Sequence, residues 1–490
     1  MTRHAEMTPH AEMSPRRDYH DAVRALNALQ TNHQILQQIR ESGGRLNEHS
    51  IPEMRAFAEK LGHRASDFDR LRVVHVAGTK GKGSTCAFAA AILGQHPRRL
   101  RVGLFTSPHL IEVRERIQID GAPLAADRFA RYFFQVYDGL RAADPPLRRV
   151  HAGSPDMPMY FRFLTLMALH AFLAEGVDVA VLEVGVGGEY DSTNVVERPV
   201  VCGIAPLGID HQATLGATIE EIAWHKAGII KQGVPVFSAP QPAAAMAVVE
   251  ARAAARAAPL QVVAPLAAAD PAAARGLGIP GDHQRTNAAL AAALCRAWAA
   301  RTGLDPGGDA WIAAGLARAR WPGRTQRFAS PRLPRLAWLV DGAHTPESMA
   351  ACARWFAAAR DPPARCVLLF NAASERDAAR LLDALHAAAG AAAGAAVPWA
   401  AAVFCPNAHA ARADSTNHTV AVDAELRPQK AAAAHWAALA ACPAAVLPSI
   451  PAAVRHIEAE AEAAAGPTCV LATGSLHLVG GVLDVAKGSL

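Results

Sequence analysis

The segment from Val73 to Leu93 constrains the fold of this 490-residue chain more than any other. An apolar run, Val73–Ala77, ends in a loop with three glycines, two lysines and a hydroxyl pair, and an alanine-rich helical pattern follows at once. Glycines let backbone N–H groups turn around phosphate oxygens, while a lysine and a helix N-terminus add positive charge. The pattern predicts a strand, a phosphate-binding loop and a helix, and it favours a nucleoside triphosphate as ligand.

The spacing of this loop departs from the strict Walker pattern, which would place its first glycine at position 76, where Val76 stands. We therefore interpret the loop as a compressed variant. Its parts are Gly78, Gly81, Lys82, Gly83 and Ser84. A plain glycine-rich turn is the alternative, but the strand before it and the helix after it favour phosphate binding.

Bulk composition bounds the class of protein. The length predicts two domains, and 51% hydrophobic with 19% charged residues is typical of a globular chain. A net charge of +5 spread over this length is too small to indicate nucleic acid or an anionic membrane as a partner, so we expect neither. It fits a small polyanionic substrate equally well.

Cysteine usage and the first residues bear on the compartment. The eight cysteines form no CxxC pair and lie mostly in apolar patterns, which predicts buried free thiols in a reducing compartment. No window holds ~18 uninterrupted apolar residues. Residues 1–18 repeat HAEM and are typical of a flexible tail, without an arginine-rich presequence. The cytoplasm is the default, and a mitochondrial pool stays open.

Strand and helix patterns alternate along the chain. Helices are expected at 19–42, 52–62 and 161–174, and from residue 72 the pattern becomes β-loop-α. The expected strands of the first series are 72–76, 102–106, 180–184 and 200–204. Alternation of this kind predicts an α/β fold with a mainly parallel, doubly wound sheet, and ligands sit at the carboxyl ends of such strands.

A second, smaller α/β series follows a proline-bearing stretch after the segment 321–326. Its expected strands are 337–340, 366–370, 403–404 and 469–472. We therefore expect a tail at 1–18, a first domain at 19–327 and a second domain at 328–490.

Polar clusters follow several of the expected strands. They are Ser107 with His109, Glu183, Asp210 and His211 with the later Lys226, Asp341 with His344, and Ser475. Taken singly, most have a bland reading as a turn, a capping pair or a solvated lysine. A carboxylate at the end of an apolar strand, as at Glu183, is costly unless a metal or cation partners it.

Two other ligand classes are disfavoured. The GVGG run at 185–188 lacks the last glycine of a dinucleotide fingerprint because Tyr190 holds that position. Zinc is disfavoured because no Cys/His set has zinc-ligand spacing.

Together these segments resemble the folylpolyglutamate synthases, a branch of the ATP-dependent Mur-ligase superfamily, in wording close to the eukaryotic type. The motifs include HVAGTKGKGST (75–85), EVGVGGEYDSTNVV (183–196), GDHQRTNAAL (281–290), WPGRTQ (321–326), DGAHTPES (341–348) and TGSLHLVGGVL (473–483). The resemblance runs from about residue 19 to the end. It implies a Mur-ligase-like P-loop N-terminal domain and a Rossmann-like α/β C-terminal domain.

The resemblance also implies a reaction. ATP would phosphorylate the γ-carboxylate on the glutamate tail of a (tetrahydro)folate, and the amino group of L-glutamate would attack the acyl phosphate, releasing ADP and phosphate. Phosphorylation supplies the leaving group that a carboxylate lacks, and cations offset the negative charge that gathers as anions meet. The implied partners are small molecules, namely folate, L-glutamate and ATP, and a monomer is expected.

Carried over motif by motif, the resemblance implies residue roles. Binding of the nucleotide would fall to Gly78, Thr79, Lys80, Gly81, Lys82, Gly83, Ser84, Asn287, Arg324 and Asp341. One Mg²⁺ would take Ser107, Glu183 and His211 as ligands, and Lys226, carbamylated by CO₂, would serve a second. His344 and Ser475 would place the incoming glutamate. The implied catalytic residues are Lys82, Lys226 and His344, and the resemblance also admits a monovalent cation such as K⁺.

Three alternatives stay open at this point. A bifunctional enzyme would also join dihydropteroate to glutamate, although the eukaryotic-type wording argues against it. A peptidoglycan-precursor ligase fits the motifs less closely. A nucleotide-dependent switch or scaffold with a degraded site would have lost charged residues first, yet Lys82, Glu183, His211, Arg324 and Asp341 are present. One departure is the segment 371–377, which lacks the glycine expected before Arg376.

Overall fold

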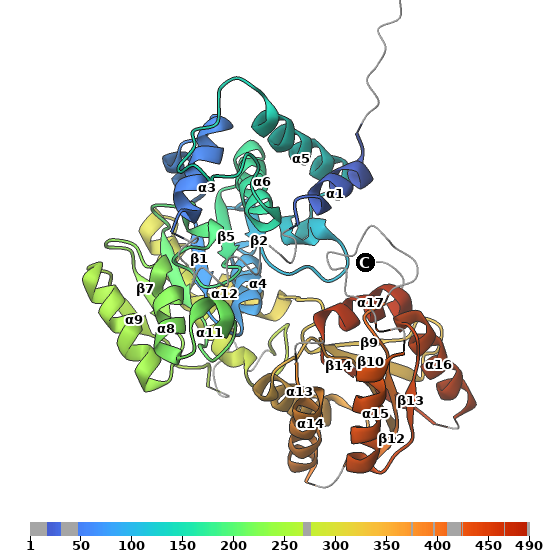
Figure 1. Ribbon diagram of the computed structural model, residues 1–490. Helices are drawn as coiled ribbons and strands as arrows, with labels where there is room; N and C mark the ends of the chain where they lie inside the picture. The colour runs from blue at the N-terminus through green and yellow to red at the C-terminus, as the bar shows by residue number, and fades with distance from the viewer. Residues whose placement is uncertain are drawn as a thin grey trace, which may run out of the picture.

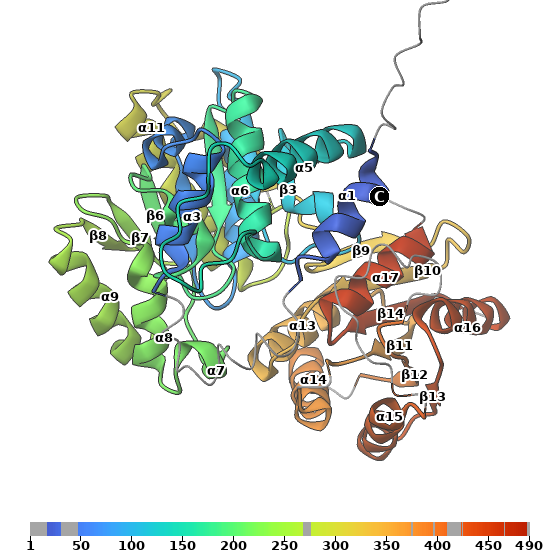
Figure 2. The ribbon, with the colours of Figure 1, turned by 45° about the horizontal axis from the view of Figure 1, so that its top comes forward.

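Two α/β lobes lie side by side in the computed structural model of the chain, each built on its own sheet (Figure 1). The structure describes residues 17–30, 48–267, 276–373, 376–394, 397–408, 423, 425–464 and 466–487. Both sheets are mainly parallel and covered by helices on two faces, as Figure 2 shows from a second direction. The expected fold class is confirmed.

The first sheet has eight strands in the order β4-β3-β2-β5-β1-β6-β7-β8. They are β1 (Val74–Ala77), β2 (Val102–Phe105), β3 (Ile117–Ile119), β4 (Ala122–Pro123), β5 (Val179–Glu183), β6 (Val201–Ile204), β7 (Val236–Ser238) and β8 (Leu260–Val262). All neighbours pair in parallel except β2 with β3 and β3 with β4. Val76 pairs with both Glu183 and Gly203, so β5, β1 and β6 end almost level. The residues that follow these strands therefore meet at one edge.

Side-chain alternation along β5 explains the two helical layers of this lobe. Val179 and Val181 pack against one layer, while Ala180 and Leu182 pack against the other, because successive side chains on a strand point to opposite faces. The first layer holds α4 (Lys82–Leu93), α11 (Gln284–Thr302) and α12 (Ala310–Arg318). The second holds α1 (Tyr19–Asn27), α3 (Ser50–Lys60), α5 (Ala126–Arg141) and α6 (Tyr160–Ala174), and α8 (Ile219–Lys226) and α9 (Ala243–Ala255) flank β6 and β7.

Short helical segments complete the first lobe. They are α7 (Gln212–Leu215), η2 (Ala65–Leu71), η3 (Val113–Arg116), η4 (Ser192–Val195) and η5 (Ala227–Ile229). Three of them, η3, η4 and α7, lie in the connections that follow β2, β5 and β6. They therefore shape the loops that surround the shared edge.

The second sheet has six strands in the order β13-β12-β11-β14-β10-β9, parallel except for β10 with β9. They are β9 (Gln326–Ala329), β10 (Leu336–Asp341), β11 (Arg365–Phe370), β12 (Trp399–Phe404), β13 (Ala444–Val446) and β14 (Thr468–Thr473). The helices α13 (Pro346–Ala359), α14 (Ala378–Ala393) and α15 (Arg427–Ala440) cover one face, and α16 (Ile450–Ala463) and α17 (Leu476–Lys487) cover the other. In Figure 1, α17 lies on the side of this lobe toward the first lobe, and α13 lines a cavity with residues 276–285 of the first lobe.

The expected elements differ from the structure mainly at their ends. The helix expected at 19–42 ends at Asn27, and residues 31–47 lie outside the described part. The helix expected at 52–62 is α3, and that at 161–174 is α6. Strands β3, β4, β7, β8, β9 and β13 were not predicted, because segments of two to four residues carry too little periodicity.

Strand β9 lies where the sequence predicts the boundary between the two lobes. The boundary expected between residues 327 and 328 falls inside this strand, which pairs with β10 through Gln326 and Val340. We propose instead that the division lies in the segment 321–325, just before β9.

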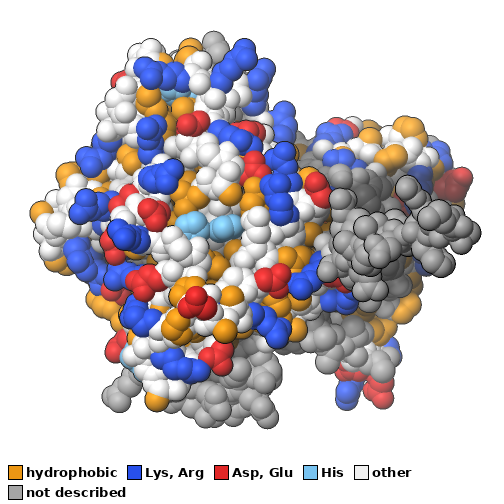
Figure 3. All heavy atoms as spheres, turned by 90° about the horizontal axis from the view of Figure 1, so that it is seen from above, with side chains coloured by type: hydrophobic (Ala, Val, Ile, Leu, Met, Phe, Trp, Pro, Cys, Tyr) orange, Lys and Arg blue, Asp and Glu red, His pale blue; other side chains and the backbone are white. Residues whose placement is uncertain are grey.

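The face of the molecule seen from above carries charges of both signs (Figure 3). Figure 3 shows Lys and Arg side chains intermixed with Asp and Glu side chains over the face seen from above. In the described ranges, every helix is too short or too polar to cross a bilayer.

We predict that close helix packing beneath the glycine-rich loop tolerates no added methyl group. A Cβ on Gly315 of α12 would lie 2.3 Å from Cα of Ile92 in α4, so Gly315→Ala should lower the stability of the fold by about 1–3 kcal/mol despite alanine's better helix propensity. In α14, Gly390 has nothing within 4 Å of such a Cβ, so Gly390→Ala should raise stability by about 0.5–1 kcal/mol. Urea unfolding midpoints check both; a stabilised Gly315→Ala variant would contradict the packing.

Candidate active site

The glycine-rich loop joins β1 to α4 and depends on glycine at two positions. Gly78 has φ 153°, and a Cβ there would lie 2.7 Å from Cβ of Ala205. Gly81 caps α4 with φ 78°, and a Cβ there would lie 2.1 Å from Oδ1 of Asn287. Only glycine therefore lets the loop close against β6 and lets Asn287 of α11 approach the helix N-terminus.

The first half of the loop is tied down by the segment that follows β6. The N–H groups of Thr79 and Lys80 both donate to the carbonyl of Pro206 at 3.0 Å. The Thr79 hydroxyl donates to the carbonyl of Gly208 at 3.0 Å and accepts from the Gly208 N–H at 3.1 Å. These two amide groups are therefore not available to a phosphate.

The second half of the loop carries four N–H groups without a partner among the described residues, those of Gly81, Lys82, Gly83 and Ser84. They form the first turn of α4, where a helix has no carbonyls of its own to offer. Unpaired amides, the helix dipole and the Lys82 ammonium together make an anion site suited to phosphate.

Lys82 lies at the carboxyl ends of the central strands of the first sheet, and its positive charge acts on three of the expected site residues. It contributes to the lowered pKa values of His211 and Lys226, and it opposes the rise that burial causes in the pKa of Glu183. These side chains come from β5, the loop after β6 and α8, so the fold brings together residues spread over 145 positions of sequence, from 82 to 226.

Glu183 ends β5 as a buried carboxylate without an ion pair. Its Oε2 accepts the Ser107 N–H at 2.9 Å, and no described cation lies within salt-bridge distance of it. Burial raises the pKa of Glu183, while Lys82, the Ser107 N–H, Arg324 and Arg116 oppose that rise. A buried carboxylate with one oxygen still unpaired has the chemistry of a metal ligand.

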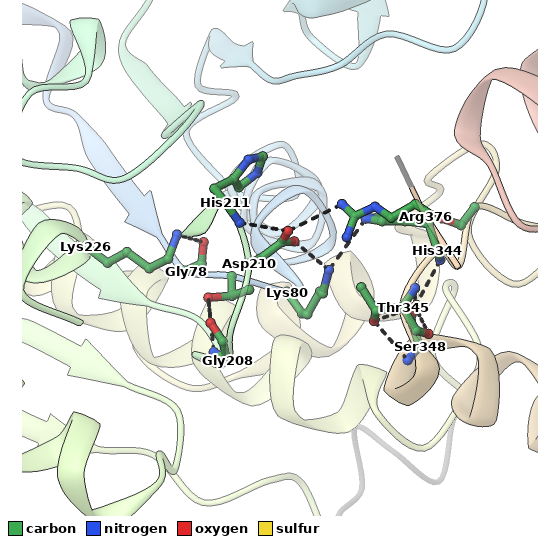
Figure 4. Close-up of polar contacts among 12 residues, drawn as sticks. Gly78, Lys80, Gly208, Asp210, His211, Lys226, His344, Thr345, Ser348 and Arg376 are labelled. Carbon is green, nitrogen blue, oxygen red and sulfur yellow. Dashed lines mark hydrogen bonds and ion pairs between the residues drawn. The ribbon is translucent and has the colours of Figure 1, made fainter. Parts of the chain in front are cut away.

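Lys226 is 2% exposed at the end of α8, and its Nζ donates to the carbonyl of Gly78 at 2.9 Å (Figure 4). Burial, and then the charge of Lys82, lowers the pKa of Lys226 from 10.5 to about 7. A Cβ on Gly188 would lie 2.8 Å from the Lys226 carbonyl, so the GVGG run packs directly on the helix that carries this lysine. The solvated-lysine reading is therefore wrong.

Asp210 joins the two lobes. Its carboxylate accepts from Lys80 of the glycine-rich loop at 3.0 Å and from Arg376 of the second lobe at 3.3 Å (Figure 4). Burial raises the pKa of Asp210, but Lys80, His211 and Arg376 outweigh burial and hold that pKa well below its usual range. Lys80 therefore points into the space between the lobes.

His344 faces this ion-pair cluster from the second lobe. Its N–H donates to the Ser348 hydroxyl at 3.1 Å, at the start of α13, where Thr345 caps the helix. Nδ1 lies 2.9 Å from the Gly342 carbonyl, so Nδ1 carries the proton and Nε2, 3.5 Å from Nζ of Lys80, is an acceptor. Burial, and then the charge of Lys80, lowers the pKa of His344 to about 4, so the ring is neutral.

The three remaining nucleotide candidates do not line the cavity between the lobes, although Asp341 and Arg324 lie close enough to act on the pKa of His283 in its wall. Asn287 donates to Gln284 at 2.8 Å, and its Oδ1 is buried without a partner among the described residues. Asp341 accepts the Thr325 N–H at 2.8 Å, and a Cβ on Gly342 would lie 3.0 Å from Nη1 of Arg324. The neighbouring cavity of about 430 Å³ is lined by Gly276, Leu277, Pro280, Gly281, Asp282, His283, Arg285, Ala351, Arg354, Trp355, Ala358 and Ala359.

Ser475 follows β14, the neighbour of β10, but makes its hydrogen bonds elsewhere. Its hydroxyl accepts from Asn407 at 3.3 Å and from the His477 N–H at 3.2 Å, at the start of α17. No contact in the described part of the chain joins it to His344 or Lys80. The loop with Ser475 still lies beside the loop with His344, because Thr473 pairs with Asp341 and Leu476 packs on Gly342. Gly480 of α17 packs on Leu110 of the first lobe.

The residues fit Mg²⁺ on phosphates better than a metal held by protein alone. Within the ranges that the structure covers, no three His, Cys, Asp or Glu side chains converge on one point. Mg²⁺ on a phosphate needs only one or two carboxylates, with waters filling the other positions. The single buried Glu183 oxygen and the neutral His211, whose pKa is lowered chiefly by burial, supply such a partial set.

Sequence reasoning missed three charged residues of this region. Asp210 was interpreted as one half of a capping pair, and Arg376 lay in the segment noted only for its missing glycine. Arg116 received no role. Their shared signal was a position just after a strand or in a motif, but their partners lie in other segments or other lobes.

Comparison with known proteins gives consistent findings. The chain matches no protein-family profile. It is 41% identical over 458 residues to the mitochondrial folylpolyglutamate synthase of Bos taurus, covering 86% of this chain and 74% of the relative. It is 41% identical over 498 residues to the folylpolyglutamate synthase of Neurospora crassa, covering 96% and 92%. The crystal structures of Mycobacterium tuberculosis folylpolyglutamate synthase complexed with ADP and AMPPCP superpose with a TM-score of 0.70 at 27% identity, covering 90% and 96%.

We predict that the Thr79 hydroxyl stabilises the loop. Thr79→Val removes both hydrogen bonds to Gly208 and leaves a half-buried carbonyl and N–H without partners, which should lower stability by about 1–2 kcal/mol and weaken nucleotide binding. Thr79→Ser keeps the hydroxyl and should behave like the parent. Urea midpoints and calorimetric titration with AMPPCP test the two variants. Equal stability and equal AMPPCP affinity of Thr79→Val and Thr79→Ser would contradict a stabilising role of the hydroxyl.

Proposed function

This chain belongs to the folylpolyglutamate synthase family, and from that premise we propose how its side chains carry out the reaction. The activity is ATP-dependent addition of L-glutamate to the γ-carboxylate of a folate, through an acyl phosphate, with release of ADP and phosphate. The observation that carries the residue assignment is the first turn of α4. Its four unpaired N–H groups and Lys82 lie beside the buried carboxylate of Glu183.

We assign the triphosphate to the turn 81–84, with Lys82 as the cation on the β- and γ-phosphates. The N–H groups point where phosphate oxygens would accept, and the ammonium offsets charge that grows as the phosphoryl group moves. The nucleoside would then reach toward the neighbouring cavity of about 430 Å³ between the lobes, with Arg324 and Asp341 beside it. Asn287 would act nearer the phosphates, because its side chain packs against Gly81 at the start of α4.

We assign one Mg²⁺ to Ser107, Glu183 and His211. When bound, the ion neutralises phosphate charge and polarises the transferred group. Glu183 is held by the Ser107 N–H, so the carboxylate is already oriented. We assign no residues to a monovalent cation such as K⁺.

We propose that Lys226 carries a carbamate. The neutral amine would attack CO₂, a bond would form between Nζ and carbon, and a proton would leave Nζ. The lowered pKa of about 7 makes that neutral amine available near physiological pH, and burial slows the loss of the product to water. The new carboxylate would face Gly78 of the loop and serve a second Mg²⁺.

We propose that the second lobe presents L-glutamate. Neutral His344 would accept from the incoming amino group at Nε2, while Arg376 and Lys80 would attract its carboxylates. Ser475 would assist from the neighbouring loop, because Thr473 pairs with Asp341 and Leu476 packs on Gly342, two residues before His344. Closure of the lobes would exclude water and protect the acyl phosphate from hydrolysis.

We propose a monomer in a reducing compartment such as the cytoplasm. All eight cysteines are buried free thiols, as the sequence predicted, which supports a cellular compartment where thiols stay reduced. The name of the Bos taurus relative makes a mitochondrial pool the alternative. Light scattering after size exclusion would test the monomer.

Loss of Lys82 should abolish catalysis without unfolding the chain. Lys82→Ala removes the cation at the phosphate turn, and we expect kcat for glutamate addition to fall by about a thousandfold or more. Circular dichroism and the thermal midpoint should stay close to the parent values. The assay uses ATP, Mg²⁺, labelled glutamate and tetrahydrofolate, with chain length read by mass spectrometry. Undiminished turnover would refute the assignment.

The same assay with dihydropteroate in place of tetrahydrofolate tests the bifunctional alternative. We expect no glutamate incorporation at a comparable rate. Comparable incorporation would show that the enzyme also makes dihydrofolate.

The extent of Lys226 carbamylation should depend on pH as expected for an amine with this lowered pKa. With a pKa of about 7, about a tenth of the amine is neutral at pH 6 and about nine tenths at pH 8. The ¹³C carbamate signal from labelled CO₂, at constant dissolved CO₂ and without nucleotide, should therefore rise across pH 6–8 and level off above. Lys226→Met should give no such signal. A rise confined to pH above about 9, as for an ordinary lysine, would overturn the proposal.

A further inference from the structure

Arg116 is a buried guanidinium without an acidic partner. It ends η3, directly before β3, and is 6% exposed. Its Nε donates to Nδ1 of His109 at 2.9 Å, and its Cζ lies 5.5 Å from the centre of the Tyr160 ring. No described residue accepts a hydrogen bond from its two Nη atoms, and neither Nη atom is among the fully enclosed polar atoms that lack a partner. The two Nη atoms of the guanidinium therefore point toward accessible space.

Two carboxylates near Arg116 do not neutralise it. Glu115 is occupied by the N–H groups of Leu110, Ile111 and Glu112, at 2.7–3.0 Å. Glu183 accepts from the Ser107 N–H and makes no salt bridge with Arg116 in the described part of the chain. Burial lowers the pKa of Arg116, which is the direction expected of a cation that lacks a close counter-charge. A buried, unpaired charge is costly to a fold, so an anionic ligand is the natural partner.

Strand order gives the direction from which that ligand comes. Glu183 ends β5, which lies between β1, with the phosphate turn, and β2, with Ser107 and Arg116 beyond it. The phosphate turn therefore lies on one side of Glu183, and Arg116 lies on its other side. The ion-pair cluster of Asp210 lies beyond β1, on the β6 side. An anion at Arg116 is neither the triphosphate nor the incoming glutamate, which leaves the folate.

We propose that Arg116 binds the α-carboxylate of the terminal glutamate of the folate tail, and so directs the γ-carboxylate of that residue toward Glu183 and the phosphate turn. This inference rests on the proposed assignment of the nucleotide and Mg²⁺. A planar guanidinium with two free Nη atoms matches a carboxylate in a bidentate pair. His109 and Tyr160 hold the plane of the fork.

The proposal explains how one site can act repeatedly. Every product of γ-linked extension ends in a new glutamate that again carries an α-carboxylate beside a γ-carboxylate. A guanidinium that recognises the terminal residue, and not the pterin, would accept each lengthened tail in the same register. Arg116 would be a substrate-binding residue that sets which carboxylate is activated.

A substrate-analogue cycle tests this contact. The analogue carries 4-aminobutyrate in place of the terminal glutamate, so it keeps the chain to the γ-carboxylate and lacks the α-carboxylate. For the parent enzyme, KM for the analogue should exceed KM for folate by about 30-fold or more. For Arg116→Met, folate should lose that advantage and the two KM values should be similar, with KM for ATP unchanged. An undiminished preference for folate in Arg116→Met would overturn the proposal, as would a loss of kcat for both substrates with the preference intact.

Stability separates binding from a structural role. Because Arg116 is an unpaired buried charge, Arg116→Met should raise the thermal midpoint while it weakens folate binding. A lowered midpoint would mark the arginine as structural and overturn the proposal. Arg114→Met is the matched control: Arg114 lies on the same η3 segment but pairs with Glu112 at 2.5 Å, so its loss should leave the folate preference unchanged. If the parent enzyme itself adds no glutamate to folate, the proposed function fails first, independently of Arg116.

Discussion

The level ending of three parallel strands is the constraint on which the rest of this structure depends. β5, β1 and β6 are held in register by Val76 with Glu183 and Gly203, so the loops that follow them emerge at one edge. The phosphate turn, the Glu183 carboxylate and the Asp210 loop are neighbours for that reason alone. Apolar residues fix the sheet between two helical layers, and polar residues at the strand ends are thereby concentrated without any direct attraction among them.

That concentration creates an electrostatic problem which the second lobe helps to solve. The charge of Lys82 contributes to the lowered pKa values of both Lys80 and Lys226, and Glu183 alone cannot balance these cations. Asp210 is the counter-charge, and it also accepts Arg376 from the second lobe. The ion pairs that relieve crowding around the loop are thus the same ones that join the lobes. Two anionic substrates and a triphosphate suit a cleft with this surplus of cations.

The fold was largely predictable from the sequence, while the site was predictable only in part. Strands such as β5 and β10 are long apolar runs, so local pattern was enough to find them. The two-residue β4 and the three-residue β3 exist only because they pair with β2, which no local pattern records. The resemblance supplied the candidates at the strand ends. It could not show that the Thr79 and Lys80 amides are already used, that Lys80 turns toward His344, or that Arg116 lacks an acid, because each fact depends on a partner distant in sequence.

The attachment of the glycine-rich loop to Pro206 and Gly208 has a consequence for how binding free energy is distributed. Four hydrogen bonds already hold the first half of the loop in place, so a triphosphate meets amides that need no ordering. The entropy that a floppy loop would lose on binding has been lost during folding instead. With the nucleotide placed as proposed, its attraction for this turn would favour the approach of Arg324 and Asp341, which lie on and after the segment 321–325 between the lobes, so nucleotide binding and lobe approach would be coupled.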